Sequence, residues 1–210
     1  MTQTLSKLIT YEEFIEWLSD DGKRYELHDG VIVEMSQPTG KHEKVISFLT
    51  LELAVQVRSM GVPYLLPKTA LVKPPRLSST SQKDSGYFPD ILLVNSENLS
   101  NEPLWEKEST IIQGASIPLL VEVVSTNWRD DYHKKFADYE EMGIPEYWIA
   151  DYAALGGRDF LGNPKQPALF VCELVDGEYV RTLYRGNTQI VSPTFPQLNI
   201  TAQQVFDAAL

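Results

Sequence analysis

Two stretches of the chain alternate between apolar and polar residues, and an Asp-Gly pair interrupts each alternation. Residues 24–35 alternate on both sides of Asp29 and Gly30, and a similar pattern occurs late in the chain, at residues 168–184. Alternation places successive side chains on opposite faces of a strand and Asp-Gly favours a two-residue turn, so both stretches are predicted to be β-hairpins. In the first hairpin Glu26 lies opposite Val33, on a face where a carboxylate that merely contacts water is unusual.

Apolar residues spaced three and four apart predict the helices. Val45, Leu49 and Leu53 lie on one stripe of a helix expected over about residues 41–59, which Gly61 ends. His42 lies on the same stripe and is expected to be a packed, hydrogen-bonded histidine. Further helix signals occur at about residues 10–19, where Thr10 and Glu13 form a capping box, at about residues 130–142, and after residue 201.

Two continuous apolar runs, residues 87–94 and 118–124, dominate the middle of the chain. Runs of Leu, Ile and Val of this length are typical of central strands that are covered on both faces. Shorter extended segments are expected at residues 64–66, 70–73 and 146–151, and residues 74–81, rich in Pro and Ser, are expected to form a surface loop. We find no repeat and no boundary, so the pattern predicts one α/β domain over residues 1–210.

Composition narrows the class of protein. Hydrophobic residues make up 43% of the 210 residues and charged residues 22%, the balance of a folded globular protein rather than a disordered one. No apolar run approaches the roughly 18 residues of a membrane span, and the N-terminus lacks the apolar stretch of a secretion signal, so we expect a cytoplasmic protein with no membrane partner. The single cysteine, Cys172, excludes an internal disulfide and a zinc site built on cysteine pairs, and its alternating strand predicts a core position.

The charge balance argues against diffuse binding of nucleic acid. The chain carries 18 Lys and Arg residues against 29 Asp and Glu residues, a formal net charge of -11, which repels polyanions. One segment differs in sign, because Lys68, Lys73, Arg76 and Lys83 follow one another with no acidic residue between them. If the protein binds nucleic acid, this segment is the expected phosphate-contacting loop.

A carboxylate lies within each of the two central apolar runs. Asp90 follows Pro89 in the first, and Glu122 lies between Val121 and Val123 in the second. A buried charge is costly unless a cation or a fixed partner compensates for it. One such acid alone suggests a capped amide or an arginine pair, but two acids in adjacent buried strands favour a divalent-cation site.

The predicted helix over residues 130–142 supplies a cation next to those acids. At about 100° per residue, Tyr132, Phe136 and Tyr139 form its buried stripe, Lys135 lies on the flank and Lys134 faces solvent. Lys135 is therefore the candidate site lysine. The alternative interpretation is a lysine whose stem covers the core while its ammonium group meets Asp131 or water.

Together these residues resemble a known family. The combination of Pro89-Asp90, residues 122–125 (Glu-Val-Val-Ser), Lys135 in the following helix and residues 146–151 (Glu-Tyr-Trp-Ile-Ala-Asp) is similar to the Uma-type restriction endonuclease family, a branch of the PD-(D/E)XK nuclease superfamily. Val124 stands where the superfamily pattern has its lysine. The spacing to Tyr139 indicates that the lysine has moved to Lys135.

The resemblance implies a restriction-endonuclease-like core, with a mixed central β-sheet, helices on both faces and additional β-hairpins. It further implies that Asp90, Glu122 and the carbonyl of Val123 ligate Mg²⁺ or Mn²⁺ and that Lys135 orients the attacking water. Glu26 would be an outer ligand or a water-orienting acid. The other interpretation of Glu26 is a salt bridge to the neighbouring Lys23 or Arg24.

Two function classes remain open at this stage. The first is an endonuclease that hydrolyses DNA by attack of metal-activated water, which cuts both strands most simply as a homodimer. The second is an interaction module that has kept the nuclease fold and lost efficient cleavage, and the net acidic charge favours it slightly. Ser125 is not surrounded by the residues of a nucleophile elbow, and we expect it to end a strand or cap a helix.

Overall fold

The computed structural model describes residues 8–18, 22–76 and 83–210. Its N-terminal part is the short helix α1 (Tyr11–Trp17) followed by a hairpin of β1 (Arg24–His28) and β2 (Val31–Met35). Thr10 and Glu13 form the expected capping box, and Glu26 pairs with Val33 as predicted. Gly30 has a φ of 79°, a conformation that glycine adopts without strain, which explains the tight Asp-Gly turn.

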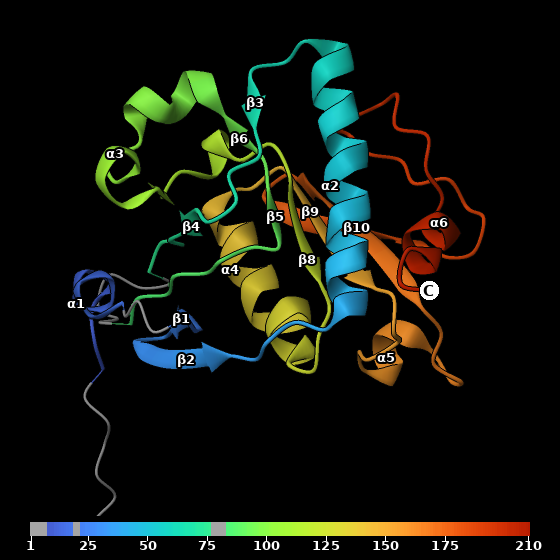
Figure 1. Ribbon diagram of the computed structural model, residues 1–210, viewed down its shortest axis with the longest axis horizontal. Coiled ribbons are helices and arrows are strands. Elements are labelled where there is room, and N and C mark those ends of the chain that lie inside the picture. The colour runs from blue at the N-terminus through green and yellow to red at the C-terminus, as the bar shows by residue number, and fades with distance from the viewer. Residues whose placement is uncertain (1–7, 19–21, 77–82) are drawn as a thin grey trace, which may run out of the picture.

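A five-stranded mixed sheet forms the centre of the molecule (Figure 1), with the strand order β11-β10-β9-β8-β5. Its strands are β5 (Ile91–Leu92), β8 (Leu120–Val123), β9 (Glu146–Asp151), β10 (Ala168–Val175) and β11 (Glu178–Tyr184). β8 and β9 are parallel and the other neighbours are antiparallel, which confirms the mixed sheet. The apolar run at residues 87–94 was expected to form a central strand. This expectation is wrong, because β5 is short and lies at the edge of the sheet.

Helices cover both faces of this sheet, as the resemblance implied. On one face α2 (Gly40–Met60) and α6 (Ala202–Asp207) pack over a core that includes Leu49, Leu53 and Trp148 (Figure 1). On the opposite face α4 (Lys135–Met142) packs over a second core that includes Tyr139 and Tyr147. α2 follows the predicted stripe and ends at Gly61, and Cys172 is buried as expected.

The remaining elements are short and lie around this centre. Two-stranded pairs join β3 (Tyr64–Leu65) to β6 (Val94–Asn95) and β4 (Leu71–Val72) to β7 (Thr110–Ile111). The short helical elements are η1 (Ser96–Asn101), α3 (Trp105–Glu108), η2 (Gly114–Ser116), η3 (Asp130–Lys134) and α5 (Arg158–Leu161). Most of the expected loop at residues 74–81 lies outside the described residues. Within the described residues, no helix combines the length and the apolar character needed to cross a bilayer.

Candidate active site

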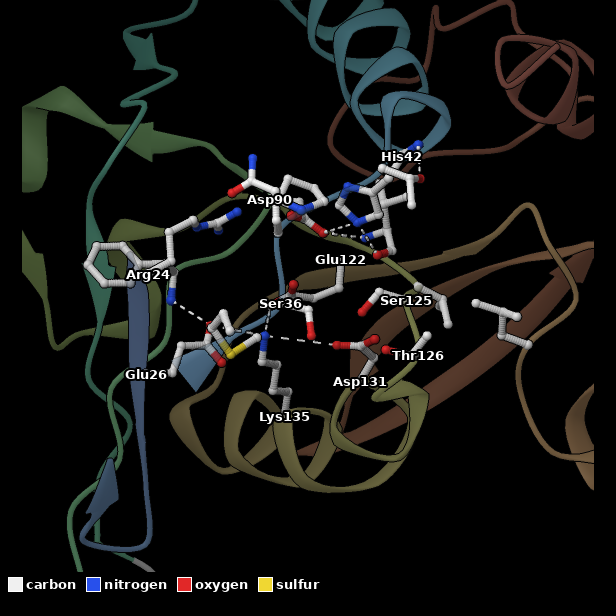
Figure 2. A pocket seen from close by; sticks show the side chains of 18 of the residues that line it. Arg24, Glu26, Ser36, His42, Asp90, Glu122, Ser125, Thr126, Asp131 and Lys135 are labelled. Carbon is white, nitrogen blue, oxygen red and sulfur yellow. Dashed lines mark hydrogen bonds and ion pairs between the residues drawn. The ribbon is translucent and has the colours of Figure 1, made fainter. Parts of the chain in front are cut away.

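A pocket of about 280 Å³ opens where β1, the start of α2, the end of β8 and the helical segment after β8 meet. The residues predicted to form the site all line it, and Figure 2 shows their side chains converging from these separate elements. They are Glu26, Asp90, Glu122, Val123 and Lys135. Their common position follows from the fold, because β5 and β8 are neighbours and α4 packs against the sheet beside them.

Lys135 lies at the centre of the buried charges. Its side chain is only 3% exposed, and its Nζ lies 3.1 Å from Oε1 of Glu122 and 3.2 Å from Oε1 of Glu26. Burial alone lowers the pKa of a lysine, but the charges of Glu122, Glu26 and Asp131 outweigh it and hold the pKa of Lys135 well above its usual range. The ammonium group is therefore charged. The alternative interpretation is correct for Asp131, whose Oδ1 lies 3.9 Å from the ammonium group, and wrong for water, because Lys135 is buried.

Glu122 contacts two donors from the same helix. Besides the ammonium group of Lys135, its Oε1 accepts a hydrogen bond of 2.9 Å from the hydroxyl of Tyr139. Burial raises the pKa of Glu122 to about 7, and the charges of Asp90 and Glu26 add to the rise while Lys135 opposes it. The single positive charge of Lys135 therefore does not fully compensate for the negative charges around Glu122.

Glu26 is held in the pocket wall by three donors. Its Oε1 accepts a hydrogen bond of 2.9 Å from the backbone N–H of Phe88 and faces Lys135, and its Oε2 lies 2.9 Å from Nε2 of His28. Burial opposes ionisation, but Lys135 and His28 outweigh it and lower the pKa of Glu26. The carboxylate is ionised.

The salt bridge considered as an alternative for Glu26 is wrong. Lys23 pairs instead with Glu34, at 2.8 Å on the exposed side of the hairpin. Arg24 is exposed and lines the pocket, and its guanidinium group makes no ion pair with the described residues.

Asp90 is fixed to the neighbouring strand β8. Its Oδ2 accepts a hydrogen bond of 2.8 Å from the backbone N–H of Val123. Nε2 of His42 lies 2.8 Å from the carbonyl oxygen of Val123 and 3.5 Å from Oδ2 of Asp90. His42 is thus packed and hydrogen-bonded, as expected, and it braces the two groups that the resemblance implies as metal ligands. Its Nδ1 is buried and has no hydrogen-bond partner among the described residues.

Asp131 is a pocket residue that the sequence analysis did not place in the site. It is 4% exposed, and its Oδ1 lies 3.9 Å from Nζ of Lys135. Burial raises the pKa of Asp131 well above its usual value, and nearby acids add to the rise. The i to i+4 spacing from Asp131 to Lys135 is a usable signal, since such residues share one helix face. The π-helical turn η3 carries Asp131, and turns of this type often occur at functional sites.

Lys134 does not simply face solvent as predicted. Its Nζ lies 3.1 Å from Oδ1 of Asp29 and 3.0 Å from Oδ2 of Asp138, and its side chain is 23% exposed. It links the turn of the first hairpin to α4. Lys134 and Lys135 are therefore both ion-paired, but only Lys135 reaches the pocket.

Part of the basic segment at residues 68–83 is already paired. Nζ of Lys73 lies 3.2 Å from Glu12 and sits over the ring of Tyr11, and Nε of Arg76 lies 2.6 Å from Asp84. These charges hold α1 and the first hairpin to the rest of the molecule. Contact of this segment with phosphate stays a prediction.

The pocket matches a hard divalent cation in its donor chemistry. Four carboxylates, those of Glu26, Asp90, Glu122 and Asp131, line it around one buried ammonium group. Oxygen ligands with excess negative charge are what Mg²⁺ and Mn²⁺ prefer. Among the described residues no group of three or more His, Cys, Asp or Glu side chains is arranged to hold a metal ion. The pocket therefore matches a divalent cation in the chemistry of its oxygen donors and in its excess of negative charge.

Comparisons with known proteins agree with this fold. A family model described as "Putative restriction endonuclease" (Uma2) matches residues 11–203. A crystal structure described as a "putative nuclease belonging to DUF820 from Anabaena variabilis" superposes with a TM-score of 0.71 and 16% sequence identity, covering 96% of this chain and 99% of that one. No curated protein matches the chain.

The mixed sheet, its flanking helices and the carboxylate-lysine pocket define a restriction-endonuclease-like protein. The chain belongs to the Uma2 family, which confirms the family expected from its residues. Family and fold together support nuclease activity.

Proposed function

We propose that the protein is a metal-dependent endonuclease that hydrolyses phosphodiester bonds of DNA with water as the nucleophile. The observation that carries the proposal is the pocket in which buried carboxylates from β1, β8 and η3 surround the ammonium group of Lys135. Such a cluster is costly to bury for stability alone. Strongly perturbed carboxyl groups at a pocket are typical of catalytic centres.

Asp90, Glu122 and the carbonyl oxygen of Val123 would hold Mg²⁺ or Mn²⁺. When bound, the ion polarises the scissile phosphate and lowers the pKa of a water molecule. Hydrogen bonds support this proposal, because the N–H of Val123 holds the Asp90 carboxylate and the hydroxyl of Tyr139 holds that of Glu122. His42 braces the Val123 carbonyl from the other side.

Lys135 acts as a cation in this scheme rather than as a base, because its pKa is held high and it keeps its proton. As water oxygen bonds to phosphorus and the bond to the leaving deoxyribose oxygen breaks, negative charge grows on the phosphoryl oxygens and on the leaving oxygen, which takes a proton from solvent water. The ammonium group stabilises that charge. Glu26 is ionised and accepts a hydrogen bond from the attacking water, which orients it and favours loss of its proton.

The rim of the pocket offers groups that can hold a phosphodiester in spite of the net charge of -11. Arg24 is an exposed guanidinium group on this rim, and Ser36, Ser125 and Thr126 bring hydroxyl groups to it (Figure 2). Arginine and hydroxyl donors are common phosphate ligands. Binding of DNA would thus be local to the pocket. Cutting both strands needs two such sites, so we propose that the protein is a homodimer. Light scattering tests this proposal.

Cleavage of supercoiled plasmid tests the proposal. Wild-type protein with Mg²⁺ or Mn²⁺ is expected to nick or linearise the plasmid, and Asp90→Ala and Lys135→Ala are expected to lose this activity. Lys134→Ala is the matched control, because it removes a lysine that pairs outside the pocket. Cleavage that survives both site variants contradicts the assigned site. Absence of cleavage by every form favours the interaction module with a nuclease fold.

A further inference from the structure

A strip of aromatic side chains with an arginine at each end joins the segment at the start of η3 to α5 and β11. The guanidinium group of Arg129 lies 4.5 Å from the ring centroid of Trp128, and that of Arg181 lies 5.4 Å from the ring of Phe160. His133 connects the two ends, with its ring 6.2 Å from Trp128 and 5.4 Å from Phe160. Elements far apart in the sequence thus build one continuous surface.

This strip begins at the edge of the pocket. Thr126 lines the pocket, and Trp128 follows it by two residues. Leu155 lines the pocket on the same side, and Gly157 follows it. A Cβ on Gly157 would lie 3.1 Å from the Trp128 ring, so the two segments leave the pocket in contact with each other. A chain-like ligand that leaves the pocket past Thr126 therefore meets the strip directly.

The arginines of the strip are exposed and make no ion pair with the described residues. Arg129 and Arg181 are held by aromatic rings, and Arg158 on α5 adds a third exposed guanidinium group. The neighbouring acids are Asp130, which accepts a hydrogen bond from Asn127, and the exposed Asp159.

We propose that this arginine-aromatic strip binds the phosphate backbone of the nucleic-acid strand that leads out of the pocket. The inference rests on the proposed nuclease function and assigns the path of its substrate. A guanidinium group matches the geometry of phosphate oxygens and forms paired hydrogen bonds with them. Rings that hold the guanidinium groups in place reduce the conformational entropy lost on binding. The occupant is a polyanion of repeating phosphates, because Arg129 and Arg181 lie at opposite ends of the ring series Trp128, His133 and Phe160.

Fluorescence anisotropy with a labelled DNA oligonucleotide tests this inference, with EDTA present to prevent cleavage. Arg129→Ala and Arg181→Ala are each expected to weaken binding by about three- to tenfold and to lower the slope of log K against log salt by about 0.9. Arg58→Ala, which removes an exposed arginine near the far end of α2, is the matched control and is expected to bind as wild type does. Arg129→Lys and Arg181→Lys keep the charge, so they are expected to retain the salt slope.

The outcomes separate this inference from the function on which it rests. Thermal denaturation confirms that each variant is folded at the temperature of the assay. Strip variants that bind with the affinity and salt slope of Arg58→Ala overturn the strip, even if wild type cleaves DNA. A wild-type protein that neither binds the oligonucleotide nor cleaves plasmid overturns the proposed function itself.

Discussion

Neighbouring strands of the sheet carry buried glutamates with different surroundings. Glu146 in β9 is fully buried, and its carboxylate accepts hydrogen bonds from Nε1 of Trp148, the hydroxyl of Ser192 and the N–H of Thr194. All three donors are neutral and each serves this one carboxylate. Glu122 in β8 instead shares the ammonium group of Lys135 with Glu26, and Asp131 lies close by.

The difference shows what distinguishes a candidate site from a structural acid. Burial of a carboxylate in a strand is common to both, and Asp151 in β9 is a further structural case, held by the N–H groups of Leu155 and Gly156 and by Tyr132. Of these three acids, only Glu122 shares a buried ammonium group with other carboxylates, and only Glu122 lines the pocket described above. Competition for one cation is therefore the informative feature.

Removal of that cation is expected to give the largest effect on stability. Lys135→Met leaves Glu26 and Glu122 buried without their counter-charge, so the free energy of unfolding near neutral pH should fall by about 3–5 kcal/mol. Lys134→Met is the matched control, with an expected loss of about 1 kcal/mol because its partners Asp29 and Asp138 lie nearer solvent or keep other bonds. Urea denaturation measures both. Equal losses would mean that the cluster does not depend on Lys135.

Added metal should compensate for the same deficit of positive charge. At about 100 times its dissociation constant, Mn²⁺ is expected to raise the free energy of unfolding by about 2.7 kcal/mol, and Glu122→Gln should abolish the increase. Thermal denaturation with and without Mn²⁺ measures it. Glu146→Gln should retain the stabilisation by Mn²⁺, because the carboxylate of Glu146 is already hydrogen-bonded by neutral protein groups. A response that depends on Glu146 and not on Glu122 would place the ion elsewhere.

Loss of the ion pair between the buried Asp84 and the exposed Arg76 gives the smallest expected effect. Asp84 accepts from Arg76 and from the N–H of Tyr11, and although burial opposes ionisation, these donors lower its pKa below the usual 3.8. A carboxyl group whose pKa is lower in the folded than in the unfolded protein stabilises the fold at pH values above the unfolded pKa. This stabilisation is lost as the pH falls through the folded pKa. Asp84→Asn should therefore lower the free energy of unfolding by about 1 kcal/mol at neutral pH and by almost nothing at strongly acid pH. The loss at neutral pH is small because Arg76 is 44% exposed to solvent. Urea titrations at both pH values test this; a constant cost would exclude the ion pair as its source.

Local signals explain what could be predicted from the sequence. The Asp-Gly turn fixed the pairing of Glu26 with Val33, and the apolar stripe of α2 fixed the burial of His42, since both depend on neighbouring residues only. The placement of Asp90, Glu122 and Lys135 in one pocket also followed from adjacent strands and the helix after them. Their catalytic and metal-binding roles stay predictions.

Features that depend on tertiary contacts could not be predicted in the same way. The i to i+4 spacing placed Asp131 beside Lys135, but it did not show that both side chains line the pocket. Lys134 was expected to face solvent from the helical projection alone, which does not report its ion pair with the distant Asp29. The strand around Ile91 was expected at the centre of the sheet, but apolar composition reports burial and not the number of neighbouring strands.

The most direct test of the central claim compares the two glutamates in one experiment. Single-turnover cleavage of a labelled DNA duplex with Mn²⁺ is measured for Glu122→Gln and Glu146→Gln at a temperature where both are folded. Glu122→Gln is expected to lower the rate at least about 100-fold, because it removes a proposed ligand and a partner of Lys135. Glu146→Gln is expected to lower stability by about 1–3 kcal/mol and leave the rate close to that of wild type. Equal rates for the two variants would contradict the assignment of the pocket as the active site.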